Sequence, residues 1–279
     1  MKWLYRSIPD RDAAMQAFDD YGFCGFTNLL ETEVLQRIHN AVDESVESGR
    51  LVIGSEEMAN NNDCIYAHEE IKALCNNKLL VDFTKNLLKQ NVELQHAKFN
   101  AKPKSSVSGI VNWHQDYPFF PHTNFDLAAA VIHLDDTIEQ SGPMEFIPGS
   151  HKRGLCSHVS PEGQFAYEVT DQGNFDTDAE PVKVLVPKGS VTFHHCLTIH
   201  RSLPKTSQSE RRLLVFQYRA VDAVQLAGVL WRCTGYQVEP NARHSNIARF
   251  PCGTSVSLRG NGGRLYDLFG TLAPDKVGY

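Results

Sequence analysis

Residues 112–120, NWHQDYPFF, place a histidine and a carboxylate two positions apart inside an aromatic run. In an extended strand, residues i and i+2 point to the same face, so His114 and Asp116 would converge on one point while Gln115 would point away. An imidazole and a carboxylate are both ligands of divalent transition metals. A single His-x-Asp pair is equally typical of a hydrogen-bonded polar patch, so a metal site requires a third ligand.

Eight histidines follow Asp116, and three of them lie in VTFHHCLTIHRSLP, residues 191–204. If one strand ran through this stretch, His194 and His200 would share a face with Cys196. His194 and His195 are more typical of hydrogen-bonded packing on a core strand than of metal ligation. A thiolate ligand at Cys196 would favour zinc or copper over Fe(II), so a buried apolar role is expected for it.

The residues that follow His200 indicate which chemistry such a site would perform. Ser202 comes two residues after His200, and Arg211 comes eleven after it, at the start of another apolar stretch. A guanidinium binds a carboxylate through two parallel hydrogen bonds, and a nearby hydroxyl is a second donor. Two imidazoles and one carboxylate on a metal with open positions, beside an Arg/Ser carboxylate site, describe a non-haem Fe(II) centre that binds an oxo-acid cosubstrate.

The elements that must position these residues change type along the chain. Residues 10–48 have a helical pattern, interrupted at YGFCGFTNLL by a turn and a short strand, and a further helix is predicted over 71–90. Between them, the polar, asparagine-rich residues 54–64 predict a loop. After residue 92, short β-branched or aromatic stretches bounded by Gly, Pro, Ser or Asp predict strands within 92–102, 127–136, 143–150, 182–196 and 211–220.

Helices first and many short strands later predict a mainly β fold with some α-helix. The expected core is a double-stranded β-helix of the jelly-roll or cupin-like type, with N-terminal helices packed on one sheet. We expect a single domain over residues 1–279. Within it, a helical part would cover about 8–92, the β core about 93–220 and a loop-rich C-terminal extension 221–279.

The bulk composition disfavours several classes of protein. With 42% hydrophobic and 22% charged residues, the chain has the composition of a soluble globular protein. A formal net charge of −6 without a run of five like charges disfavours nucleic acid and membrane partners. Seven scattered cysteines without a CxxC pair, and no signal-peptide pattern, predict a reducing cytoplasmic location. We expect a monomer or homodimer that acts on a small molecule.

Three blocks of the sequence resemble the phytanoyl-CoA dioxygenase family of Fe(II)/2-oxoglutarate oxygenases: WHQDYPFFPHTNFDLAAAVIHLDD, SGPMEFIPGSHKRG and HRSLPKTSQSERR. YGFCGFTNLLETEVLQRI also resembles the family's N-terminal turn, strand and helix, and the similarity covers roughly residues 18–220. The resemblance implies Fe(II), 2-oxoglutarate and O2 as cofactors and cosubstrates. It makes His114, Asp116 and His200 the iron ligands.

The same resemblance implies how the cosubstrate binds. Arg211 would pair with the distal carboxylate of 2-oxoglutarate, with Ser202 assisting. Lys98 and Gln115 fall at or beside positions that contact the cosubstrate in relatives.

The residues that follow the iron ligand suggest where a substrate would bind. Tyr117, Phe119 and Phe120 directly follow Asp116, on a segment expected to line the pocket mouth, and are candidates for substrate contact. An aromatic mouth without clustered Lys or Arg favours a small organic metabolite or natural-product intermediate over a fatty-acyl-CoA.

The carboxylate ligand also bears on the reaction. Halogenase relatives replace the carboxylate ligand by Ala or Gly, so Asp116 favours hydroxylation, or a desaturating or ring-forming variant, with release of succinate and CO2. Two alternatives stay open. One is a metalloenzyme on the same barrel without 2-oxoglutarate, which would leave Arg211 and Ser202 without a role. The other is a non-catalytic ligand-binding β-sandwich, in which the three ligands would be coincidental.

Overall fold

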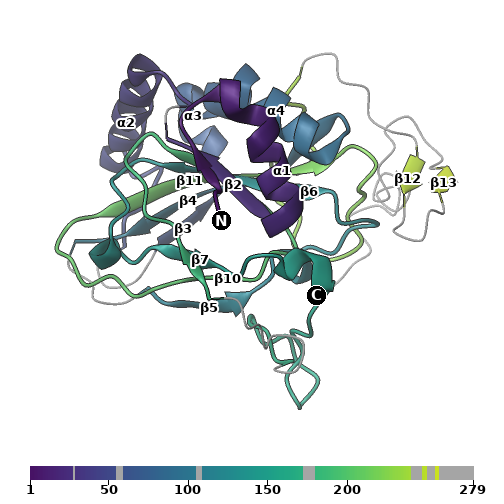
Figure 1. Ribbon diagram of the computed structural model, residues 1–279. Helices are drawn as coiled ribbons and strands as arrows, with labels where there is room; N and C mark the ends of the chain where they lie inside the picture. Colours follow the sequence, from purple (N-terminus) through teal and green to yellow (C-terminus); the bar gives the residue numbers. More distant parts are fainter. Residues whose placement is uncertain are drawn as a thin grey trace, which may run out of the picture.

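The computed structural model describes residues 1–27, 29–54, 59–104, 109–171, 180–239, 247–249 and 255–257. Within these residues two β-sheets lie face to face, and α-helices cover the outer side of the larger sheet (Figure 1). The prediction of a mainly β fold with some α-helix is therefore confirmed. Of the predicted C-terminal extension, only the residues up to 239 and one short strand pair lie within the described part.

The strands form two principal sheets. The larger sheet has the order β1 (Leu4–Tyr5), β2 (Phe23–Phe26), β9 (Val191–His195), β6 (Leu127–His133), β11 (Arg211–Ala220), β4 (Val92–Lys102) and β3 (Ala59–Asn62). The smaller sheet has the order β5 (Val111–His114), β10 (His200–Ser202), β7 (Met144–Phe146) and β8 (Val182–Lys183). A separate pair joins β12 (Ile247–Arg249) to β13 (Ser255–Ser257).

The helices are α1 (Arg11–Tyr21), α2 (Thr32–Glu47), α3 (Glu69–Cys75) and α4 (Lys78–Leu88), with short 3-10 helices at Ile8–Asp10, Cys64–Tyr66, Tyr117–Phe119, Glu139–Ser141 and Ser150–Arg153. The prediction of one helix over 71–90 is wrong, because this segment contains parts of two helices. The Asn77 side chain accepts hydrogen bonds from the backbone N–H groups of Leu79 and Leu80 at 3.0 and 3.4 Å. Asparagine at this position caps a new helix instead of continuing the old one.

The prediction of a loop over 54–64 is also wrong in part, because β3 forms the edge of the larger sheet. It pairs antiparallel with β4, with Asn60 opposite Asn100 and Asn62 opposite Lys98. The side chain of Asn61 exchanges two hydrogen bonds of 2.8 Å with the backbone of Val52, which holds the strand in place. Asparagine is depleted in strands, and here tertiary pairing overrides that local preference.

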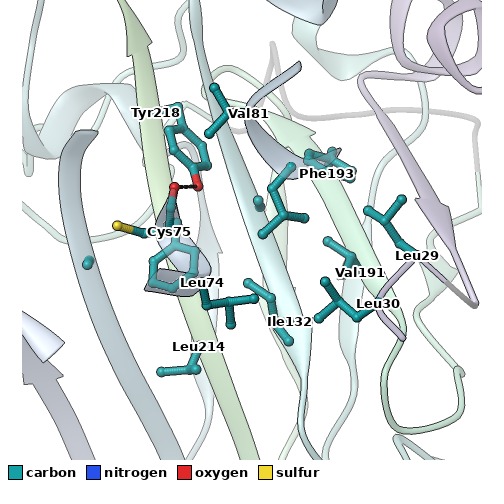
Figure 2. Packing of buried hydrophobic residues seen from close by; sticks show 14 of the residues in the cluster. Leu29, Leu30, Leu74, Cys75, Val81, Ile132, Val191, Phe193, Leu214 and Tyr218 are labelled. Atoms are coloured by element: carbon teal, nitrogen blue, oxygen red, sulfur yellow. Dashed lines mark hydrogen bonds between the residues drawn. The ribbon is translucent and has the colours of Figure 1, made fainter. Parts of the chain in front are cut away.

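The main hydrophobic core lies between the helices and the outer face of the larger sheet. Figure 2 shows Phe193, Leu214 and Tyr218 among the buried side chains of this layer. The Phe193 ring lies 4.8 Å from that of Phe83 on α4. The Tyr218 hydroxyl donates a hydrogen bond of 2.8 Å to the carbonyl oxygen of Cys75 (Figure 2). These contacts fix the sheet against the helices.

Within the described part of the chain, no helix combines the length and the apolar character that crossing a bilayer requires.

We expect Phe193→Ala to lower the free energy of unfolding by about 3–5 kcal/mol, because truncating a buried phenylalanine removes apolar contacts and leaves a cavity. Phe165→Ala is the control, since Phe165 is 38% exposed; its change should stay below about 1 kcal/mol. Urea unfolding followed by circular dichroism measures both values. Equal losses in the two variants would contradict the packing described.

Two buried histidines should make the stability sensitive to acid. Burial lowers the pKa of His96 and that of His133 to about 3, whereas an imidazole in the unfolded chain has a pKa of about 6.5. Between these values the unfolded state binds more protons. The free energy of unfolding should therefore fall as the pH drops from about 6.5 towards 3, by up to about 1.4 kcal/mol per pH unit for each histidine.

Denaturant unfolding of the metal-free protein across this pH window measures the slope of the free energy of unfolding against pH. His133→Gln should reduce the slope by about the contribution of one proton. A stability that does not change with pH in this window would show that these imidazoles are not held neutral.

Candidate metal centre

His114, Asp116 and His200 each offer one ligand atom, and these atoms lie within 4.8 Å of one another. His114 ends β5 and lies directly opposite His200, which begins β10. Asp116 follows β5 and precedes the 3-10 helix Tyr117–Phe119 in an αR backbone conformation. Its Oδ1 atom lies 3.8 Å from Nε2 of His114 and 3.7 Å from Nε2 of His200. The three predicted ligands therefore converge, although Asp116 lies outside the extended strand that was expected.

Backbone carbonyl groups determine which nitrogen of each imidazole faces Asp116. Nδ1 of His114 donates to the carbonyl oxygen of Asn112 at 2.8 Å, and Nδ1 of His200 donates to that of Thr198 at 2.9 Å. A carbonyl oxygen only accepts, so the hydrogen is on Nδ1 and the lone pair is on Nε2. A hydrogen bond from the second ring nitrogen is the usual support of a metal-bound histidine.

Burial and charge keep the three ligand groups in the form that binds a metal. Burial lowers the pKa of His114 and of His200 below the ordinary imidazole value. Burial acts to raise the pKa of Asp116, but His200 and His194 hold it well below its usual range. The donor set is thus two neutral imidazoles and a carboxylate, which fits Fe(II) with open coordination positions.

His194 supports the carboxylate from the opposite sheet. The condition that one strand runs through 191–204 is not met, because β9 ends at His195 and β10 begins at His200 in the other sheet. The chain turns between them, and the His194 and His200 rings face each other with centroids 4.6 Å apart. Nε2 of His194 lies 3.0 Å from Oδ2 of Asp116. Because His194 engages Oδ2, Oδ1 is left to face the two histidine ligands.

Arg211 and Ser202 meet although they belong to different sheets. Arg211 is fully buried, and its guanidinium donates to Ser202 Oγ at 3.1 Å and to the carbonyl oxygen of Gly142 at 2.6 Å. No carboxylate of the described residues pairs with it, and its Nε atom is buried without a partner. Burial lowers the pKa of Arg211 to about 10, so it remains a cation at neutral pH.

Lys102 contacts Ser202 in this cluster, and this contact was not predicted from the sequence. It lies directly opposite Arg211 in the β4–β11 register, is fully buried and donates to Ser202 Oγ at 2.8 Å. Burial, with Arg211 and Lys205 nearby, lowers the pKa of Lys102 to about 6. The two-residue period of a strand puts Lys98 and Lys102 on the same face of β4. This periodicity in the sequence could have indicated that Lys102 lies near the site.

A glycine makes room for this cluster. Gly142 has φ of +72°, and a Cβ atom there would lie 2.6 Å from the Leu203 carbonyl oxygen and 2.7 Å from Lys102 Nζ. A larger residue would displace both groups, so the Arg211 and Ser202 arrangement depends on glycine at this position.

A cavity of about 340 Å³ lies between the sheets and connects the three ligands with Arg211 and Ser202. Val131, Met144, Leu213 and Val215 supply apolar lining, and Asn60, Asn62, Lys98 and Asn100 supply polar lining from β3 and β4. Three candidate metal ligands, a buried guanidinium with a hydroxyl beside it, and room for small molecules therefore share one space.

The sequence profile of the phytanoyl-CoA dioxygenase (PhyH) family matches residues 18–213. This chain belongs to the PhyH family. It is a non-haem iron oxygenase that depends on 2-oxoglutarate, also called alpha-ketoglutarate, and its cofactors and cosubstrates are iron, 2-oxoglutarate and O2. Family membership argues against both alternatives, the enzyme without 2-oxoglutarate and the non-catalytic sandwich.

Individual relatives differ in reaction. The chain is 38% identical over 164 residues to a probable alpha-ketoglutarate-dependent hypophosphite dioxygenase of Stutzerimonas stutzeri, a match that spans 57% of this chain and 56% of that relative. It is 26% identical over 241 residues to an L-proline trans-4-hydroxylase of Streptomyces griseoviridis, which spans 77% and 88% of the two chains.

The fold is also found in a solved structure. The epimerase SnoN in complex with Fe3+, alpha-ketoglutarate and nogalamycin RO superimposes with a TM-score of 0.67 at 17% identity, over 91% of this chain and 95% of that one.

Other residues predicted for the PhyH site lie in different surroundings. Lys98 lines the cavity. Gln115 is fully buried, and its amide donates to the carbonyl oxygens of Gly154 and Leu197 at 2.9 and 2.8 Å and accepts from the Cys156 N–H at 2.8 Å. Its side chain thus joins the segment Gly154–Cys156 to Leu197, and its contact with the cosubstrate stays a prediction.

Among the aromatic candidates for substrate contact, Phe119 lines the cavity, and its ring centroid is 5.6 Å from that of His114. Tyr117 is buried, and its hydroxyl donates to the carbonyl oxygen of His122 at 2.5 Å. Phe120 is buried against His96. Of these three side chains, Phe119 is the one in position to touch a substrate in this conformation.

We expect His194→Phe to weaken Fe(II) binding to this PhyH enzyme by about 10- to 100-fold, the usual effect of removing a group that orients a metal ligand. His195→Phe is the matched control, because His195 lies on the outer face of the same strand, 6.0 Å from the Phe18 ring. Anaerobic titration against a competing chelator measures both affinities. Unchanged affinity in His194→Phe would show that Asp116 is oriented without it.

Proposed function

We propose that this enzyme oxidises, and most simply hydroxylates, a small organic metabolite or natural-product intermediate, with conversion of 2-oxoglutarate to succinate and CO2. We also propose that the two sheets are the double-stranded β-helix core of a single domain. The observation that carries the functional proposal is Arg211, a buried cation without a carboxylate partner among the described residues, which lines the cavity that also contains the ligand triad.

A buried charge is costly unless it is paired. The distal carboxylate of 2-oxoglutarate would supply the missing negative charge, with Arg211 donating in the fork geometry that suits a carboxylate. The Ser202 hydroxyl, which lies 3.1 Å from Arg211, is positioned as a further donor. Lys102 would position Ser202, because its Nζ atom donates to Oγ at 2.8 Å. The other end of the cosubstrate would then reach the metal.

The iron, when bound, supplies oxygen activation coupled to oxidative decarboxylation of the cosubstrate. The residues of the chain hold the reactants. His114, Asp116 and His200 would hold the metal, and Arg211 would set the direction of the cosubstrate. Because Asp116 provides a carboxylate ligand, hydroxylation or a related C–H oxidation is favoured over halide transfer.

The size of the cavity limits the substrate. About 340 Å³ is near the lower end of the range of ligand pockets, which is about 300–1,000 Å³, and the space must also hold 2-oxoglutarate. A compact substrate is therefore favoured. A second candidate function is the oxidation of a small phosphorus oxyanion, which is favoured by the 38% identity with the probable hypophosphite dioxygenase.

Anaerobic addition of Fe(II) and 2-oxoglutarate tests the proposal. We expect the weak visible charge-transfer absorption of an iron-chelated oxo-acid, followed by succinate when oxygen is admitted. Asp116→Ala should produce neither signal. If the folded wild-type protein also lacks both signals, the proposed function is wrong.

Arg211→Gln should raise the KM for 2-oxoglutarate by about 10- to 100-fold, because hydrogen bonds to a charged group are worth about 1.5–3 kcal/mol. Arg212→Gln is the matched control. Arg212 points to the opposite face, where it pairs with Asp135 at 2.9 Å and Asp43 at 2.8 Å. The KM of the Arg212→Gln variant for 2-oxoglutarate should therefore equal that of the wild type. Succinate assays at varied 2-oxoglutarate give both constants. An unchanged KM in Arg211→Gln would remove Arg211 from the cosubstrate site.

A further inference from the structure

The polar wall of the cavity comes from two paired strands at the edge of the larger sheet. In the β3–β4 register, Asn60 lies opposite Asn100 and Asn62 lies opposite Lys98. All four side chains line the cavity. The wall thus presents three amides and one ammonium group to the same space as the iron ligands.

Lys98 has no negatively charged partner once every other charged group of the cavity is matched with a group of opposite charge. Arg201 also lines the cavity, but it pairs with Glu145 at 2.6 Å. Under the proposed function, the charges of Fe(II), Asp116, Arg211 and doubly negative 2-oxoglutarate cancel. The backbone of Lys98 pairs with β11 and β3, but its side chain forms no ion pair or hydrogen bond with any residue in the described ranges. One positive charge therefore remains for another ligand.

Lys98 lines the same cavity of about 340 Å³ as His114, Asp116 and His200. A molecule that bound Lys98 and presented a hydrogen to the metal would therefore be short. The modest cavity volume favours the same kind of molecule.

The amides beside Lys98 have hydrogen-bonding capacity to spare. The Oδ1 atom of Asn100 is buried without a hydrogen-bond partner, so it is free to accept a hydrogen bond from a protonated oxygen of a bound ligand. Asn60 and Asn62 are exposed on the same face of the edge strand. Amide N–H groups and an ammonium group together donate to the oxygen atoms of an anion.

We propose that Lys98, Asn62 and Asn100 form the substrate subsite and that the substrate is a compact anion bound through its oxygen atoms. Asn60 borders the same subsite from the edge strand. The apolar residues Val131, Met144, Leu213 and Val215 line other parts of the cavity. They are suited to the uncharged part of the substrate. This inference rests on the proposed use of 2-oxoglutarate, and it assigns Lys98 to the substrate and not to the cosubstrate.

The test begins with the anaerobic Fe(II)–2-oxoglutarate enzyme, whose visible absorption band reports that the cosubstrate is bound. Hypophosphite, phosphite and propionate are then titrated by calorimetry, with propionamide as the neutral counterpart of propionate. We expect at least one anion to bind and propionamide not to bind. A preference for hypophosphite and phosphite would indicate a phosphorus oxyanion, and a preference for propionate an organic acid.

Variants then locate the binding site. Lys98→Met and Asn100→Asp should each weaken binding of the preferred anion by about tenfold or more, because one removes a charge-assisted hydrogen bond and the other adds a repelling charge. Both should leave the affinity for 2-oxoglutarate within about twofold. Lys104→Met is the matched control, since Lys104 lies outside the cavity lining and its Nζ is 4.0 Å from Glu210. The Lys104→Met variant should bind the anion with the affinity of the wild type.

Three results would overturn the subsite. The first is tight binding of propionamide, or no binding of any anion, by enzyme that shows the 2-oxoglutarate band. The second is a Lys98→Met variant that loses affinity for 2-oxoglutarate but not for the anion, which would return Lys98 to the cosubstrate. In both cases the proposed function stands. The third is absence of the band itself, which would remove the proposed function and with it the charge balance on which the subsite depends.

Discussion

Strand side chains alternate between two faces, and both the stability and the chemistry of this enzyme depend on that alternation in the larger sheet. Phe193 points into the core beneath the helices, and the next residue, His194, points into the cavity and contacts Asp116. In the same way Arg212 pairs with surface carboxylates, whereas Arg211 is buried beside Ser202. A shift of register by one residue would exchange core and site.

The smaller sheet completes the centre by bringing together residues that are far apart in the chain. β5 and β10 pair so that His114 lies opposite His200, and β10 carries Ser202 to Arg211. Each metal ligand is then held by groups outside the triad, the two imidazoles by backbone carbonyls and the carboxylate by His194. These hydrogen bonds orient the three side chains before a metal is bound.

The cavity is electrostatically incomplete without its ligands. Arg211 is buried with hydrogen-bond acceptors but no carboxylate in the described part of the chain. Burial of this charge costs free energy, and the same burial lowers the pKa of Arg211. The extensive apolar core under α4 offsets such costs, because the free energy of folding is a small difference between large terms. Anionic ligands are therefore expected to stabilise the folded protein as well as to react in it.

The sequence by itself determined the strands with strong apolar patterns, such as Val92–Lys102 and Arg211–Ala220, and the chemical types of the ligand set. It did so because apolar period and ligand chemistry are local properties. The break at Asn77, the edge strand Ala59–Asn62 and the turn between His195 and His200 were decided by capping and pairing with distant segments. Lys102 and His194 joined the site for the same reason. Their roles depend on which residues face each other across the two sheets, and only the tertiary structure fixes that.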